Sequence, residues 1–141
     1  MCVEIDQMGQ TPIYQQLRNQ VVAAIASRQL SPGDGLPSVR SLAGELGINL
    51  HTVNKTYALL RDEGYVLMRG RAGAVVAEPP GGGTDEKRLL DGLLLLAREH
   101  KAAGGTREEF GASVARALDE TYGTSGAVTD VDSAAREGQD A

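Results

Sequence analysis

The sequence predicts a mainly α-helical fold with one small β-hairpin, followed by a second, shorter helical region. Apolar residues recur at intervals of three or four in five separate stretches, which is the pattern of amphipathic helices. Two short β-prone runs, residues 65–68 and 74–76, flank a glycine-rich turn and predict the hairpin. A proline- and glycine-rich linker, residues 78–83, separates the hairpin from the last two helical stretches.

The first helix is expected after a lead-in of residues 1–10. Thr11 is a good N-cap, and Pro12 suits the first helical position. Apolar residues then recur at intervals of four, namely Ile13, Leu17, Val21 and Ile25. We expect this helix to continue to about residue 27, where the turn-forming cluster 30–35 follows.

A helix-turn-helix pattern follows over residues 38–64. Gly47 stops a short helix, Asn49 is a good N-cap for the next one, and Gly64 suits the C′ position after it. The inward-facing positions of the two helices are Val39, Leu42, Leu46, Val53, Tyr57 and Leu60. Two helices joined by about three residues that include a glycine have helix-turn-helix spacing.

The outward face of residues 50–63 is polar at its beginning and acidic at its end. Its first half carries side chains that reach base edges and phosphates, namely His51, Thr52, Asn54 and Lys55. Asp62 and Glu63 make the other end acidic, which suits a recognition helix docked on DNA by its N-terminal end. A solvated face is the commoner explanation for one such helix taken alone. The order of the elements, ending in a hairpin with the basic tip 69–73, favours a winged helix-turn-helix domain over residues 11–77.

Charge is unevenly distributed along the chain. Fourteen Lys and Arg against nineteen Asp and Glu give a net charge of −5. Residues 1–77 hold seven basic and six acidic residues, whereas residues 78–141 hold seven and thirteen. Four cations of the first part lie in acid-free windows, namely Lys55, Arg61, Arg69 and Arg71. A binding surface needs local charge rather than a basic total, so the net charge does not exclude a nucleic-acid partner.

Composition excludes several other classes. The single cysteine, Cys2, leaves neither a disulfide framework nor a thiolate zinc site within one chain, and His51 and His100 lie far apart. We therefore expect no metal and no cofactor. Neither a run of about 18 apolar residues nor a secretory signal is present, which leads us to expect a cytoplasmic protein without a membrane span. No Ser/His/Asp set or carboxylate pair stands out, so we do not expect an enzyme.

The C-terminal part is expected to hold two helices over residues 84–122. Thr84 would cap the first helix, and Thr106 with Glu109 forms a capping box for the second. Gly104 and Gly105 separate the two helices. Residues 123–141 are small, polar and aperiodic, and we predict a disordered tail.

Leucines in the C-terminal part cover more than one face of its first helix, so we expect burial on two sides. They could form an internal core that covers the DNA-binding domain, or a dimer interface. Because a unit of two helices buries too little surface to enclose them, we favour a dimer. The residues that we assign to that interface are Leu89, Leu90, Leu93, Leu94, Leu96, Ala97, Phe110 and Val114.

The N-terminal pattern resembles the GntR family of bacterial transcription regulators over about residues 11–77. The matching residues are Pro12-Ile13-Tyr14, Gln16-Leu17, Leu30, Pro32-Gly33-Asp34, Leu36-Pro37-Ser38-Val39-Arg40-Ser41-Leu42-Ala43, Leu46-Gly47-Ile48-Asn49, Thr52-Val53, Leu60 and Glu63-Gly64. The short C-terminal region resembles that of the YtrA-type subfamily. Longer effector domains of the family do not fit in the remaining length.

This resemblance implies roles for individual residues. Arg40 would reach the DNA, residues 49–55 would enter the major groove, and the wing tip 69–71 would lie in or beside the minor groove. The predicted DNA contacts are Ser38, Arg40, Asn49, Leu50, His51, Thr52, Asn54, Lys55, Arg69, Gly70 and Arg71. Leu50 stands where many members have Arg, and Asn54 where many have Arg or another polar residue. The loss of an Arg removes a potential bidentate guanine contact worth roughly 1–3 kcal/mol. His51 and Ala74 also depart from the usual pattern, so the operator sequence does not follow from the resemblance.

We accordingly expect a homodimeric transcription regulator, a repressor, that binds a pseudo-palindromic double-stranded DNA operator. The alternative is a winged-helix module that binds another protein and not DNA. The net charge of −5 and the residues at 50 and 54 favour that alternative. A small-molecule effector is left open, and the hinge after the hairpin is where its binding would change half-site spacing. The regulated genes and the sign of regulation also stay open.

Overall fold

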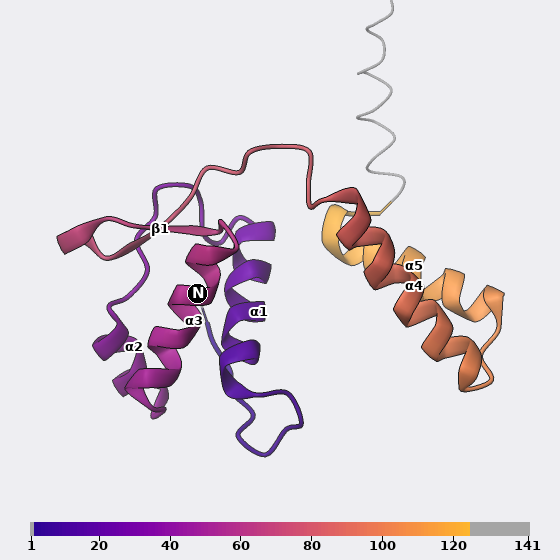
Figure 1. Ribbon diagram of the computed structural model, residues 1–141, viewed down its shortest axis with the longest axis horizontal. Helices are drawn as coiled ribbons and strands as arrows, with labels where there is room; N and C mark the ends of the chain where they lie inside the picture. Colours follow the sequence, from indigo (N-terminus) through magenta and orange to yellow (C-terminus); the bar gives the residue numbers. More distant parts are fainter. Residues whose placement is uncertain (1, 125–141) are drawn as a thin grey trace, which may run out of the picture. The chain divides into compact units, whose positions relative to one another are not determined.

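The computed structural model describes residues 2–124 of the chain. The chain divides between Gly81 and Gly82 into two compact units, called here the N-terminal and the C-terminal unit (Figure 1). Most of the tail that we predicted over residues 123–141 lies outside the described residues. The architecture is five α-helices and one two-stranded antiparallel hairpin, which confirms the predicted fold class.

Helix α1 spans Ile13–Ala26 and begins one residue later than predicted. Pro12 occupies the N-cap in an extended conformation, with φ −56° and ψ 148°, and no side chain caps the helix. The expectation that Thr11 is the N-cap is therefore wrong. The reason is local: the Pro12 carbonyl already accepts the first main-chain bonds, from the N–H groups of Gln15 and Gln16, each at 3.0 Å. Boundary shifts of one residue are common at such proline starts.

Helices α2 (Val39–Leu46) and α3 (Leu50–Asp62) form the predicted helix-turn-helix. Gly47 ends α2 in the left-handed conformation, with φ 67°, which a residue with a side chain adopts at a cost. The Asn49 side chain then accepts a hydrogen bond from the His51 N–H and caps α3. Glycine and asparagine thus reverse the chain within three residues, as predicted.

Strands β1 (Val66–Met68) and β2 (Ala74–Val76) form the wing and pair antiparallel, with Val66 opposite Val76. A single 3₁₀ turn, η1 (Gly70–Ala72), lies at the tip. The segment before α2, residues 33–35, pairs with the outer side of β2 and so extends the hairpin. Gly35 bridges Val75, and the Gly33 N–H donates to the Val76 carbonyl at 2.8 Å. The sequence indicated only a turn there, because a pairing across some forty residues leaves no local pattern.

The core of the N-terminal unit lies where α1, α2, α3 and the wing meet. Its fully buried side chains of largest volume are Leu17, Leu60, Val21, Val53, Val66 and Thr56. Helices α1 and α3 lie side by side along their length (Figure 1). This packing fixes one side of α3 against the core and leaves its other side to solvent.

The chain before α1 forms a strap, defined here as residues 3–6, that runs along α1. Gln20 accepts from the Glu4 N–H and donates to the Glu4 carbonyl. Gln16 does the same for Asp6, with both distances at 2.8 Å. Two side-chain amides one helical turn apart therefore match alternate residues of an extended chain. Ile5, which lies between them, and Val3, which precedes Glu4, are partly buried against the core.

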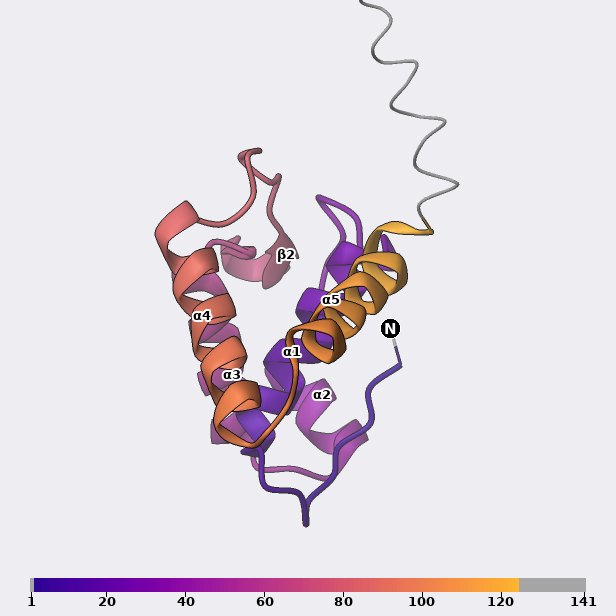
Figure 2. The same cartoon turned by 90° about the vertical axis from the view of Figure 1, so that its right-hand side faces the viewer.

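The C-terminal unit is a helical hairpin of α4 (Glu86–Ala102) and α5 (Arg107–Tyr122), joined by a short turn (Figure 2). Asp85 caps α4 by accepting from the Arg88 N–H at 3.1 Å, so the prediction of Thr84 as the cap is wrong. The predicted capping box of α5 is confirmed, with Thr106 and Glu109 exchanging both bonds. The bond from the Thr106 N–H lowers the pKa of the Glu109 carboxyl.

Leucines of α4 are more exposed than the sequence led us to expect. Within the described chain, α5 covers one side of α4, and the least exposed apolar side chains are Leu94, Ala97, Phe110 and Val114. The other predicted interface residues are exposed by two fifths or more, namely Leu89, Leu90, Leu93 and Leu96. Burial on two sides is therefore not reached by the described residues of one chain.

Candidate nucleic-acid interface

Helix α3 presents a polar face because its apolar face is held by the core. Val53, Thr56, Tyr57 and Leu60 are buried. The predicted contact residues His51, Asn54 and Lys55 are exposed on the opposite side, and Leu50 is 38% exposed. Thr52 is half-buried. The structure thus brings together on one surface the side chains that the helical periodicity had placed outward.

Two of the predicted contact residues act as helix caps. The Ser38 hydroxyl accepts from the Ser41 N–H at 3.0 Å, and the side-chain amide oxygen of Asn49 (Oδ1) accepts from the His51 N–H at 2.7 Å. Each cap fixes the first turn of the helix that it precedes. Arg40 is exposed in that first turn of α2. Ser38 and Asn49 therefore set the direction in which Arg40 and His51 leave the surface.

Tyr57 connects α3 to the start of α2. Its hydroxyl donates to the Pro37 carbonyl at 2.7 Å, and only 2% of the residue is exposed. Burial raises the pKa of the Tyr57 hydroxyl to about 12. The expectation that Tyr57 packs in the core is confirmed, and its hydroxyl in addition holds the two helices in register.

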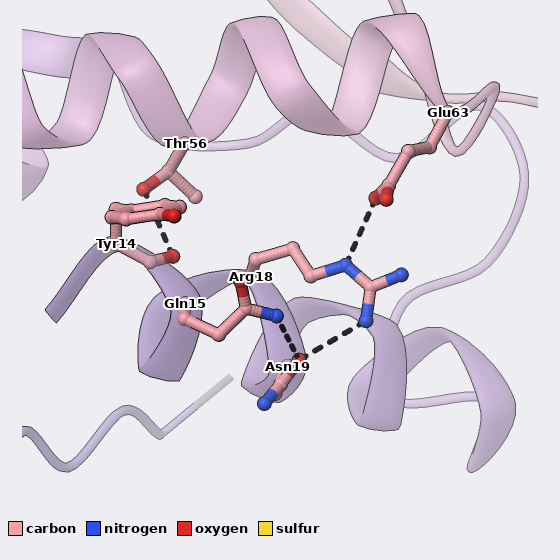
Figure 3. A network of polar contacts seen from close by, with 6 residues as sticks. All are labelled: Tyr14, Gln15, Arg18, Asn19, Thr56 and Glu63. Atoms are coloured by element: carbon pink, nitrogen blue, oxygen red, sulfur yellow. Dashed lines mark hydrogen bonds and ion pairs between the residues drawn. The ribbon is translucent and has the colours of Figure 1, made fainter. Parts of the chain in front are cut away.

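The acidic end of α3 is neutralised from within the domain (Figure 3). Arg18 of α1 donates to Glu63 at 2.9 Å, and its guanidinium lies 5.6 Å from the centre of the Tyr65 ring. Only 14% of the Arg18 side chain is exposed. Sequence reasoning missed this pair, because its members are 45 residues apart. Glu63, at the end of the helix that we expected to face away from DNA, therefore brings little net negative charge to the surface.

Lys55 makes a different kind of contact. Its ammonium lies 3.9 Å from the centre of the Tyr14 ring, within the range of a cation–π interaction. Arg61, another cation of the acid-free windows, pairs instead with its neighbour Asp62 at 3.0 Å. None of the ion pairs within residues 2–124 includes Lys55, Arg40 or a wing arginine.

The wing tip is basic and exposed. Arg69 and Arg71 are both exposed, on either side of Gly70. Gly70 has φ 56° and Gly73 has φ 76°, and the Arg69 N–H donates to the Gly73 carbonyl at 2.8 Å. The two glycines allow the sharp turn that places both arginines at the end of the hairpin.

Metal sites and membrane-spanning helices were also considered for the described residues. Residues 2–124 contain no group of three His, Cys, Asp or Glu side chains arranged to hold a metal ion. Among the same residues, every helix is too short or too polar to cross a bilayer.

Comparisons with known proteins give the family. The family model described as "Bacterial regulatory proteins, gntR family" matches residues 13–76. The YtrA repressor of Bacillus subtilis is 35% identical over 98 residues, which cover 69% of this chain and 71% of the repressor. The regulator YhcF of the same organism is 33% identical and is covered to 84% of its length. An HTH-type regulator of Mycobacterium tuberculosis is 37% identical, with 62% of its length covered.

A solved structure agrees with these relatives. The GntR-family transcription factor YtrA from Sulfolobus acidocaldarius has a TM-score of 0.57 and 37% identity, covering 69% of this chain and 97% of that one. The polar face of α3, the basic wing and these likenesses lead to one conclusion. The chain belongs to the GntR family, in its YtrA-type subfamily, and is a DNA-binding transcription regulator with a winged helix-turn-helix fold.

Proposed function

We propose that the chain represses transcription as a homodimer bound to a pseudo-palindromic operator. The observation that carries the proposal is the set of exposed cations and amides in the N-terminal unit, with His51, Asn54 and Lys55 on α3 and Arg69 and Arg71 on the wing. Such side chains suit base edges and phosphates. Repression follows if the bound dimer excludes RNA polymerase from the promoter.

Recognition of bases would come from the first half of α3. Asn54 can pair with adenine and His51 can donate to an acceptor in the major groove, whereas Leu50 suits a thymine methyl group. Arg40 and the wing arginines would set the register by contacts with phosphates. We expect specificity to depend on His51 and Asn54, and salt dependence to depend on the cations.

A dimer is supported by the apolar face that α4 leaves exposed. Leu89, Leu93 and Leu96 follow one another at intervals of four and three, and between 40% and 56% of each is exposed. A contiguous apolar stripe exposed to water is typical of a surface that binds another protein chain. Two copies related by a two-fold axis would bind half-sites about one helical turn, ~34 Å, apart. The YtrA relative from Bacillus subtilis is a transcriptional repressor, and we propose the same role for this chain.

The test measures binding of the purified chain to the DNA upstream of its own gene. Fluorescence anisotropy reports the binding, in the presence of excess unrelated DNA. We expect specific binding with a Kd of about 10⁻⁸ M. Arg69→Glu with Arg71→Glu should abolish it. The control pair Arg88→Glu with Arg98→Glu makes the same charge change on α4 and should bind as the wild type does.

Two outcomes would contradict the proposal. If the wing pair and the α4 pair weaken binding equally, the effect is one of net charge and the wing is not in contact with DNA. If no DNA from a random-sequence selection is enriched, the winged helix binds a protein partner instead, which is the alternative that the acidic composition favours.

A further inference from the structure

We infer that Tyr14 is a positioning residue, whose ring holds the Lys55 ammonium ready for a DNA phosphate. The inference rests on the proposed function and deepens it. Lys55 Nζ lies 3.9 Å from the centre of the Tyr14 ring, so an α1 side chain orients a cation on the exposed face of α3. Tyr14 is half-buried and Lys55 is exposed.

The Tyr14 main chain is fixed independently of its ring. The hydroxyl of Thr56, which is fully buried, shares its proton between the Thr52 carbonyl at 3.0 Å and the Tyr14 carbonyl at 3.3 Å (Figure 3). Consecutive residues of α3 therefore contact the same residue of α1, Thr56 through the carbonyl and Lys55 through the ring. A substitution at position 14 removes the ring contact and keeps the main-chain bond.

An aromatic ring and a carboxylate hold a cation with different consequences. A carboxylate neutralises the charge, as Glu63 does for Arg18. A ring orients the ammonium and leaves its full positive charge available to an external anion. None of the ion pairs within residues 2–124 uses Lys55. Because a free lysine loses much rotamer entropy when it is immobilised, prior orientation by Tyr14 strengthens a phosphate contact.

The experiment is a double-mutant cycle on DNA affinity, with Tyr14→Leu, Lys55→Gln and the two combined. We expect Tyr14→Leu to weaken binding about two- to five-fold in the presence of Lys55. In the Lys55→Gln background it should have no effect, since there is no ammonium to orient. Lys55→Gln should also make the log–log salt dependence shallower by about 0.9, the slope of one phosphate contact.

Tyr14→Phe is the matched control, because it keeps the ring and removes only the hydroxyl. We expect it to bind as the wild type does. The same variants are followed without DNA by NMR, where the ring face should shift the Lys55 Hε protons upfield in the wild type and in Tyr14→Phe, and not in Tyr14→Leu. Thermal unfolding establishes that each variant is folded.

Each other result has a distinct meaning. Additive losses in the cycle, or a wild-type resonance position for Lys55 in Tyr14→Leu, would overturn the positioning role. A loss in Tyr14→Phe as large as in Tyr14→Leu would show that the hydroxyl itself touches DNA. In these cases wild-type binding persists and the proposed function stands. If the wild type binds no DNA, both are overturned together.

Discussion

At the scale of single residues, a few side chains decide how the recognition surface is held. Tyr57 fills the core with its ring and reaches the Pro37 carbonyl with its hydroxyl, at 2.7 Å. Gly105 leaves room for the ring of His100, which a Cβ at position 105 would overlap. Neither feature involves a group that would touch DNA, and each can be tested by a minimal change.

Removing the Tyr57 hydroxyl should destabilise the fold. Tyr57→Phe keeps the ring and leaves the Pro37 carbonyl without its donor, and we expect the free energy of unfolding to fall by about 0.5–1.5 kcal/mol. Chemical denaturation at pH 8 measures the change. Tyr122→Phe is the control, since Tyr122 is 75% exposed, and it should leave stability unaltered. Equal effects of the two substitutions would exclude the Pro37 bond as the cause.

The same hydroxyl predicts a dependence on alkaline pH. Burial raises the pKa of Tyr57 from 10.0 to about 12, so the unfolded chain releases the proton first as the pH rises. The stabilisation is complete below pH 10 and is lost between about pH 10 and 12. The stability difference between the wild type and Tyr57→Phe should therefore shrink from pH 9 to pH 11. A constant difference over that range would contradict the assignment.

Gly105→Ala should displace His100 from its contact with Phe110, whose ring centre lies 5.7 Å away. Because the His100 side chain is 36% exposed and can turn away, the cost is the lost contact between the two rings, about 0.5–1.5 kcal/mol, and thermal unfolding of the full chain should show it. The loss should be smaller when His100→Ala is present, because the overlapping ring is gone. Gly111→Ala, where a Cβ meets nothing within 4 Å, is the control, and it should stabilise α5 by up to about 1 kcal/mol because alanine is the better helix former.

At the scale of elements, some helix ends could be predicted from the sequence and others could not. Asn49, Gly47 and the Thr106–Glu109 box were predictable because a cap is a local arrangement of a few residues. Thr84 and Asp85 are both good caps, and choosing between them requires the geometry of the first turn. Element order and periodicity likewise predicted the exposed face of α3 and the wing tip. The contact of Lys55 with Tyr14 was not predictable, because it depends on how α1 packs across α3.

The cap of α4 can be tested directly. Asp85→Ala removes the acceptor of the Arg88 N–H, and we expect it to destabilise the helical hairpin by about 0.5–2 kcal/mol. Amide hydrogen exchange in the first turn of α4 should become faster. Thr84→Ala should change neither quantity. If the threonine substitution has the larger effect, the helix begins one residue earlier in solution.

At the scale of the whole molecule, the chain combines a self-contained recognition unit with a hairpin that leaves much apolar surface exposed. The N-terminal unit has a closed core built from three helices and the wing. In the C-terminal unit, no residue of α4 or α5 is buried. If a second copy covers this surface, as proposed, dimerisation and folding of this unit should be coupled.

Charges in the leucine stripe should therefore break the dimer. Leu89→Glu with Leu96→Glu places two carboxylates in the proposed interface, and we expect sedimentation equilibrium to give a monomer and loss of high-affinity DNA binding. Leu95 is 57% exposed and lies on another side of α4. Leu95→Glu should remain dimeric. A monomeric wild type, or a dimer that survives the double substitution, would contradict the interface.

The strap of residues 3–6 carries a consequence for how this protein can vary. Gln16 and Gln20 engage the main chain of Asp6 and Glu4, which every amino acid other than proline supplies in the same form. Substitutions at position 4 other than proline should therefore be silent, whereas the Asp6 carboxylate also accepts from the Met8 N–H at 3.0 Å and neither glutamine has an equivalent replacement of the same length. In a library of all single substitutions, position 4 should tolerate most residues, position 6 should favour those that can replace this acceptor, and positions 16 and 20 should tolerate very few.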